Sequence, residues 1–136
     1  MDTLAWLLLA LPLLSAATIH LGLKNLQNVS ALLSTAVAGA ILLITIFLIS
    51  SETTDVSFSW ATLPDIEIEI GLKLDFFAKN MMLVVTGVGF LVHLFSLAYM
   101  KEDSAKARYF GALSLFMFSM TGIVLASNFI MMFVFW

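Results

Sequence analysis

The chain alternates between long uncharged runs and short polar segments. Residues 4–23, 29–49, 80–100 and 109–136 contain no charged side chain, and nearly all the charges lie between these runs. About 20 consecutive apolar residues are enough for a helix to cross the hydrocarbon core of a bilayer. The pattern therefore predicts a membrane-spanning helix in each of the four runs.

The last uncharged run is longer than one crossing requires, and it contains the pair Ser127-Asn128. Both residue types favour helix caps over apolar helix interiors, so we expect the fourth helix to end near Ala126 and a fifth to begin at Phe129. Residues 129–136 would rise only about 12 Å, far less than the ~30 Å hydrocarbon core. We therefore expect the chain to be the N-terminal piece of a longer protein.

Residues 50–75 differ from the rest because they are rich in acidic side chains and follow a period of two. Apolar and polar residues alternate strictly over 66–75 and more briefly over 56–60, with Pro64-Asp65 between the two stretches. Such alternation is typical of paired strands, and Pro-Asp is turn chemistry. The segment is predicted to be a β-hairpin on the membrane surface, with a structureless acidic loop as the alternative.

The predicted fold is an all-α integral membrane protein with four complete transmembrane helices, the first turns of a fifth, and an extracytoplasmic β-hairpin between helices two and three. Residues 1–49 would hold helices one and two, residues 50–75 the external segment, and residues 76–136 the remainder of one incomplete domain. The composition, 62% hydrophobic and 11% charged, excludes an ordinary soluble domain. The expected surroundings are the lipid bilayer, and the lack of a basic cluster argues against nucleic acid as a partner.

Basic residues in short loops indicate orientation, because they are enriched on the cytoplasmic side. The loops at residues 24–28 and 101–108 hold four of them, against Lys73 and Lys79 on the opposite side. We expect the N-terminus and the hairpin to be external. Lys79 follows Asp75 by one helical turn, so a surface ion pair or a snorkelling side chain is the expected role of this lysine.

The third run carries polar and small residues on one helical face, namely Thr86, Gly89, His93, Ser96 and Met100. His93 falls near mid-bilayer, where an ionisable side chain is costly unless it faces protein or water. Because imidazole exchanges protons near neutral pH, a proton path through His93 and Thr86 is one hypothesis. The other is a neutral histidine that forms a hydrogen bond across a helix interface, and His20 is expected to be structural.

Small residues at helical spacing are the usual signal for close packing of membrane helices. The residues expected to pack in this way are Gly87, Gly89, Gly111, Ser114 and Gly122. The chain has no cysteine and only two histidines, in different helices. The sequence therefore predicts no metal site, no cofactor and no catalytic residue within this chain.

Several stretches resemble a known family. Leu72-Lys73-Leu74-Asp75, the run from Met82 to Ser96 (MLVVTGVGFLVHLFS) and Tyr99-Met100 are similar to the N-terminal region of chain L, also called chain 5, of NADH:quinone oxidoreductase (respiratory complex I). The similarity continues through three further stretches, at residues 108–110, 115–120 and 124–136. The run from Thr86 to His93 is also shared with the large subunit of multisubunit cation/proton antiporters.

This resemblance implies a proton-translocating subunit of the membrane arm of a translocase, in the inner (plasma) membrane of a bacterium. Its partners would be other membrane-arm subunits, with no direct contact to NADH or quinone and no redox site in this chain. In the family, a glutamate central to proton transfer typically follows the tryptophan that matches Trp136, and the essential lysines come later. The alternatives are the antiporter subunit and a membrane scaffold that transports nothing.

Overall fold

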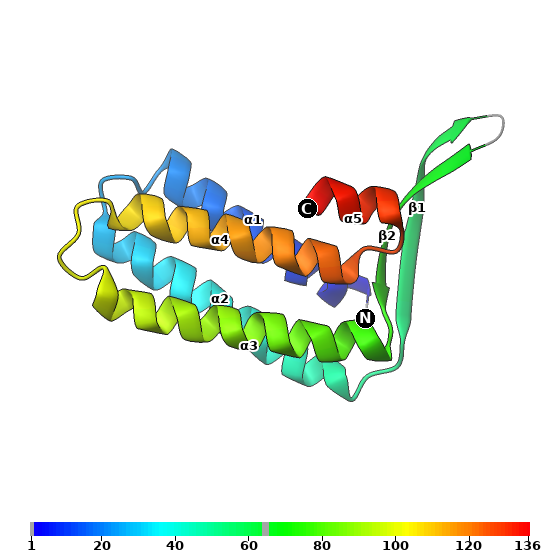
Figure 1. Ribbon diagram of the computed structural model, residues 1–136, viewed down its shortest axis with the longest axis horizontal. Helices are drawn as coiled ribbons and strands as arrows, with labels where there is room; N and C mark the ends of the chain where they lie inside the picture. The colour runs from blue at the N-terminus through cyan, green and yellow to red at the C-terminus, as the bar shows by residue number, and fades with distance from the viewer. Residues whose placement is uncertain (1, 64–65) are drawn as a thin grey trace.

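Four long helices form an antiparallel bundle in the computed structural model, which describes residues 2–63 and 66–136. They are α1 (Asp2–Leu21), α2 (Gln27–Ile49), α3 (Phe76–Tyr99) and α4 (Lys106–Leu125). Figure 1 shows α1 and α3 running one way and α2 and α4 the other. The α1–α2 and α3–α4 loops therefore share one end of the bundle, called the loop end. The N-terminus and the two strands lie at the other, the hairpin end.

The four predicted spans are confirmed, since each of these helices is long and apolar enough to cross a membrane. All four begin earlier than the uncharged runs, and the difference is largest for α3 and α4. Helix α3 starts at Phe76 rather than Asn80, because the Asp75 carboxylate caps it by accepting a hydrogen bond from the amide of Ala78 (2.8 Å). Its first turn, residues 76–79, thus fills the interval between the predicted external segment and the uncharged run.

Helix α4 begins at Lys106, within the stretch 101–108 that was predicted to be a charged loop. Side chains at the start of α2 hold this first turn. The amide of Ala107 donates to Gln27 Oε1 (2.6 Å), and Lys106 Nζ donates to Asn28 Oδ1 (2.9 Å). The prediction missed this turn because charge alone cannot show that a neighbouring helix supplies acceptors.

The predicted hairpin is confirmed as two antiparallel strands, β1 (Thr54–Leu63) and β2 (Ile66–Leu74). Thr54 pairs with Leu74 at the base, and the register shifts once, between Ser59 and Ala61. The expected Pro64-Asp65 turn lies outside the described residues. The strands run across the hairpin end of the bundle and project past its side (Figure 1).

The break between α4 and a short helix α5 (Phe129–Phe135) lies at Ser127 and Asn128, as predicted. Strand β2 holds it in place. The amide of Ser127 donates to the carbonyl of Gly71 (3.1 Å), and Asn128 Nδ2 donates to the carbonyl of Glu69 (2.7 Å). Asn128 Oδ1 also caps α5 by accepting from the amide of Met131 (2.8 Å). The hairpin thus sets the point at which the chain turns into α5.

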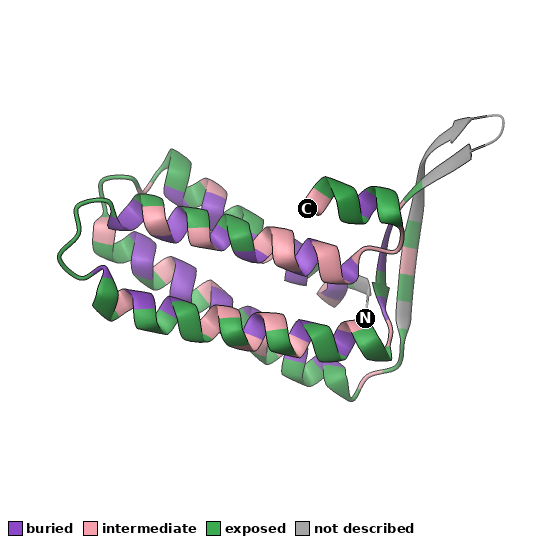
Figure 2. Cartoon of the chain, viewed as in Figure 1, coloured by how far each residue is buried: buried purple, intermediate pink, exposed green. Residues whose placement is uncertain are grey.

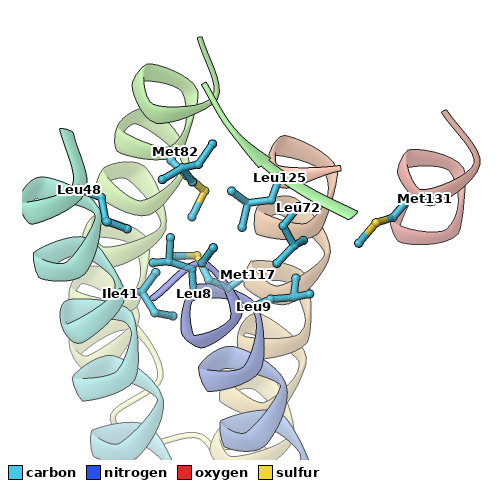
Figure 3. Close-up of a cluster of buried hydrophobic side chains, with 11 residues drawn as sticks. Leu8, Leu9, Ile41, Leu48, Leu72, Met82, Met117, Leu125 and Met131 are labelled. Carbon is cyan, nitrogen blue, oxygen red and sulfur yellow. The ribbon is translucent and has the colours of Figure 1, made fainter. Parts of the chain in front are cut away.

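The main apolar core lies between the helices near the hairpin end, as Figure 3 shows. Leu72 and Leu74 of β2 enter it from the end of the bundle, so the hairpin is packed against the helices. The other buried members come from all five helices: Ala5, Leu8, Leu9, Ile41, Leu48, Met82, Met117, Leu125 and Met131.

The outward faces of the helices are also apolar (Figure 2 marks them as exposed). Large exposed side chains include Leu14, Leu32, Leu43, Phe47, Val84, Val88, Leu91, Phe95, Leu115 and Phe116. A soluble domain rarely exposes such continuous apolar surface. With four helices of spanning length, this surface identifies an integral membrane protein.

Candidate functional site

The polar face predicted on α3 is buried inside the bundle. The exposed fraction is 0% for Thr86 and 1% for both His93 and Ser96. Ser96 Oγ lies 3.0 Å from the hydroxyl of Tyr109 on α4, so the two can share a hydrogen bond. The sequence period therefore placed these side chains on the correct face of the helix.

The hydrogen bond of His93 defines which of its ring nitrogens remains available. Nδ1 lies 2.7 Å from the carbonyl oxygen of Gly89, one turn earlier in α3. Because a carbonyl only accepts, Nδ1 must carry the hydrogen, and in the neutral ring Nε2 is then an acceptor. Nε2 is buried and has no hydrogen-bond partner among the described residues. A buried acceptor without a partner costs about 1–3 kcal/mol, so the position favours a donor supplied by water or by another part of the protein.

His93 also lines a cavity of about 250 Å³ between α3 and α4. Its ring is the only polar side chain in the lining, which is otherwise apolar apart from the backbone at Gly89: Val84, Val85, Val88, Val92, Leu113, Phe116, Met117 and Met120. The His93 ring thus lies at an almost entirely apolar cavity, where a water molecule would have few polar partners.

Thr86 shares the buried face but forms no hydrogen bond with His93. Its hydroxyl donates to the carbonyl of Met82 (2.7 Å), a bond within α3. The structure thus brings the two predicted proton-path residues to one face without joining them through described side chains. A path between them would need water or groups from elsewhere, and their role remains a prediction.

Ser114 is the centre of a polar contact between three helices. Its Oγ lies 2.7 Å from Ser34 Oγ on α2 and 3.2 Å from Ser15 Oγ on α1, and Ser34 also donates to the carbonyl of Phe110 (3.2 Å). Ser114 was predicted to pack closely. Ser15 was not, because a single serine in an apolar run forms no periodic stripe.

Three of the predicted packing glycines lie against side chains from other helices. A Cβ atom at Gly111 would clash with the ring of His20, one at Gly122 with the ring of Phe135, and one at Gly89 would lie 2.5 Å from Met117 Sδ. Glycine is needed at positions 111 and 122, because any side chain there would displace the neighbouring ring. These positions join α4 to α1, α4 to α5 and α3 to α4.

Gly87 differs, because no atom lies within 4 Å of its Cβ position in the described part of the chain. It therefore makes no close helix contact of the predicted kind there. The prediction had grouped Gly87 with Gly89, although residues two apart on a helix point in different directions.

Lys79 is the residue whose role was predicted wrongly. It does not pair with Asp75. Its ammonium group is buried and donates to the carbonyl oxygens of Ser51 (2.5 Å) and Glu52 (3.0 Å), just after the end of α2. Asp75 instead pairs with Lys73 (3.6 Å). The hydrogen bond from Ala78, and secondarily the Lys73 charge, hold the pKa of Asp75 below its usual value.

The described residues bring together no group of three or more histidine, aspartate or glutamate side chains that could hold a metal ion. Among the described residues, the interior of the bundle presents one buried imidazole, that of His93, with one nitrogen free of a hydrogen bond. Such a group can accept and return a proton.

Residues 60–110 match the family described as NADH-Ubiquinone oxidoreductase (complex I), chain 5 N-terminus. NADH-quinone oxidoreductase subunit L of Mycobacterium tuberculosis (strain CDC 1551 / Oshkosh) is 34% identical, over 96% of this chain and 22% of its own length. The chloroplastic NAD(P)H-quinone oxidoreductase subunit 5 of Angiopteris evecta is 30% identical, over 96% of this chain and 18% of its own.

Among solved structures, a chain in the structure of the Mrp complex from Dietzia sp. DQ12-45-1b has the same fold. The TM-score is 0.76 and the identity 28%, over 97% of this chain and 14% of that one. The chain thus spans about a fifth of the length of the curated relatives it matches. Sequence and fold thus agree over nearly all of its residues, and the chain is similar to the N-terminal part of complex I chain 5 and subunit L, as the resemblance indicated.

Proposed function

We propose that this chain forms the N-terminal helices of a proton-translocating subunit in the membrane arm of an NADH:quinone oxidoreductase. The observation that carries the proposal is the 34% identity with a subunit L over 96% of the chain. The subunit would couple electron transfer elsewhere in the complex to proton movement. Its partners would be the other membrane-arm subunits, and NADH and quinone would bind outside this chain.

His93 is the residue proposed to take part in proton movement. It is buried in a span, its Nδ1 is committed to Gly89, and its Nε2 is an open acceptor. A water molecule that reaches Nε2, or a donor from another part of the assembled protein, would supply the proton that it accepts. Thr86, on the same face, would supply a hydroxyl to such a water path.

The distribution of basic residues supports an orientation. The loop end holds Lys24, Lys101, Lys106 and Arg108, and the hairpin end holds Lys73 and Lys79. Since basic residues are enriched in cytoplasmic loops, we place the loop end in the cytoplasm and the hairpin outside a bacterial plasma membrane. In this arrangement the hairpin is extracytoplasmic.

The second candidate is the large subunit of a multisubunit cation/proton antiporter. It is favoured by the fold shared with a chain of the Mrp complex, at a TM-score of 0.76. The two functions differ in what drives proton movement, because an antiporter uses a cation gradient and needs no electron donor. The same buried histidine would serve either.

Deleting the gene and assaying inverted membrane vesicles separates these candidates. NADH-driven acidification of the vesicle interior, followed with a quenched fluorescent dye, should be lost in the deletion strain and restored by the full-length gene. Retained acidification together with loss of a sodium-driven pH change would instead establish the antiporter. If both activities survive deletion, the chain is a scaffold and the transport proposal fails.

Two substitutions at His93 test the proposed residue in the full-length subunit. Leucine removes the polar group, whereas glutamine keeps hydrogen-bonding capacity but cannot titrate near neutral pH. Both His93→Leu and His93→Gln should lower NADH-driven acidification at least tenfold while NADH oxidation by the assembled complex continues. Normal acidification by His93→Gln would show that the ring only packs and bonds.

Thr45→Val is the matched control for Thr86→Val. Both hydroxyls are buried and both donate to a carbonyl one turn earlier, to Ile41 (2.9 Å) and Met82 (2.7 Å) respectively. Only Thr86 shares the face of His93. Thr86→Val should therefore reduce acidification and Thr45→Val should leave it unchanged. Equal effects of the two variants would assign Thr86 to packing.

A further inference from the structure

A second cavity, of about 320 Å³, lies at the loop end, remote from the apolar core. It is formed where α1 ends and α4 begins. Its lining comes from these two helices, the first residue of α2 and both loops: Ile19, His20, Lys24, Gln27, Ser104, Ala105, Ala107 and Arg108. No acidic residue belongs to the lining, in contrast to the adjoining loop.

The charge around this cavity is positive. Lys24 and Arg108 both line it and are exposed, and neither forms an ion pair with a described residue. The two nearby acidic residues are Glu102 and Asp103, and neither lines the cavity. Asp103 accepts a hydrogen bond from the amide of Ala105 (2.7 Å) and so is held within its own turn. The cavity thus presents two free cations together with a histidine ring.

The backbone adds to this field. Helix α4 begins at the cavity wall, and no side chain caps it at Ala105. Gln27 Oε1 accepts from the amide of Ala107 (2.6 Å), so one amide of the first turn already has a partner, and the positive end of the helix dipole faces the same region. A dipole end alone does not make a site, but here it faces a cavity that already contains Lys24 and Arg108.

We propose that this cavity binds the phosphate group of an anionic membrane phospholipid. The cavity lies at the level where two spanning helices end, which is the depth of lipid headgroups. Leu21 and Leu26, both more than half exposed, flank it and would contact the acyl chains. Basic pockets between helices at a membrane surface recognise such headgroups through paired cations. The site is independent of the proton path and of the proposed function.

The test uses the full-length subunit purified within its complex, with bound phospholipid extracted and quantified by mass spectrometry. The variant Lys24→Gln/Arg108→Gln removes both cations. Each basic residue near a membrane surface contributes about a fivefold preference for anionic lipid, so the double variant should retain at least tenfold less of it. Lys101→Gln is the matched control, because Lys101 is an exposed lysine of the same end but does not line the cavity.

Ala105→Phe provides a second variant, which fills the cavity and leaves the charge unchanged. This variant should also lose the bound lipid. If anionic lipid were held only by a diffuse attraction to the basic loops, the variant would retain it. Equal lipid retention by wild type and both cavity variants would overturn the proposal.

Reconstitution into phosphatidylcholine nanodiscs with a rising fraction of phosphatidylglycerol separates lipid from free phosphate. Binding should follow the phosphatidylglycerol fraction and resist millimolar inorganic phosphate. Displacement by inorganic phosphate would show a site for the free anion and would contradict a lipid ligand. NADH-driven acidification, measured on the same preparations, reports the proposed function separately.

Discussion

The ammonium group of Lys79 lies 2.5 Å from the carbonyl oxygen of Ser51 and 3.0 Å from that of Glu52. It therefore joins the first turn of α3 to the residues just after α2, across the base of the hairpin. Both carbonyls belong to residues that follow Ser50, the C-cap of α2. The buried ammonium group gives each of them a donor and lies close to the negative end of the α2 dipole.

Replacing Lys79 by methionine should lower the free energy of unfolding by about 2 kcal/mol, because charged hydrogen bonds are lost and the carbonyls are left without donors. Thermal unfolding in detergent measures this. Lys73→Met is the control, since its ion pair with Asp75 is exposed and should contribute less than about 1 kcal/mol. Equal losses for the two variants would contradict the buried role of Lys79.

The glycines of α3 and α4 should differ in their tolerance of a methyl group. Gly122→Ala would push against the Phe135 ring and should destabilise the contact between α4 and α5. Gly87→Ala meets open space and should be neutral or stabilising by up to about 1 kcal/mol, through better helix propensity. Unfolding midpoints of the two variants give the comparison. A larger loss at Gly87 would indicate that another chain packs there.

Ser114→Ala should destabilise the bundle because it removes the partner of both Ser15 and Ser34. Hydrogen bonds between membrane helices contribute about 0.6 kcal/mol on average and at most about 1.7, so a loss of about 1 kcal/mol is expected. Ser119→Ala, elsewhere on α4, should have almost no effect. The double variant Ser34→Ala/Ser114→Ala should cost less than the sum of the two single changes.

Stability should fall in acid through Asp75. The pKa of its carboxyl group is lowered in the folded state, first by the amide of Ala78 and then by Lys73. Its contribution is therefore complete above the ordinary carboxyl pKa of about 4 and is lost as pH falls through the lowered value. Asp75→Asn retains a good helix cap but has no charge to titrate. The unfolding midpoint should fall less between neutral and acidic pH in this variant than in the wild type. An equal fall of the midpoint in both proteins would rule out Asp75 as the cause.

The proposed orientation predicts which end of the bundle reacts with an external reagent. The chain has no cysteine, so a single one can be introduced into the full-length protein after any others are replaced. Ser57→Cys, on β1, should react with an impermeant maleimide in intact cells. Glu102→Cys, at the loop end, should react only after permeabilisation. The reverse pattern would invert the topology.

Prediction from sequence succeeded where the signal lies within one element. Uncharged length specified the spans, alternation specified the strands, and the capping preferences of Ser127 and Asn128 located the break before α5. For the candidate site, helical period placed Thr86 and His93 on one buried face. Each of these inferences uses only residues close together in the chain.

Contacts between elements could not be obtained in the same way. Helical period says which residues share a face, but not which neighbour covers that face. The partner of Lys79 therefore came out wrong, and the contact of Ser15 with Ser114 was missed. The free Nε2 of His93 depends on the side-chain rotamer that lets Nδ1 reach Gly89, and no pattern of residue types specifies that rotamer.

The attachment of Asn128 to Glu69, residues 59 positions apart in the chain, has a consequence for biogenesis. Membrane helices enter the bilayer in the order of their synthesis, but α5 is oriented by a strand made before α3 and α4. The hairpin must therefore be in place when the start of α5 docks against it. A hairpin that formed late would leave the start of α5 without its anchor, so whatever follows in a longer subunit would be inserted from an undefined starting point.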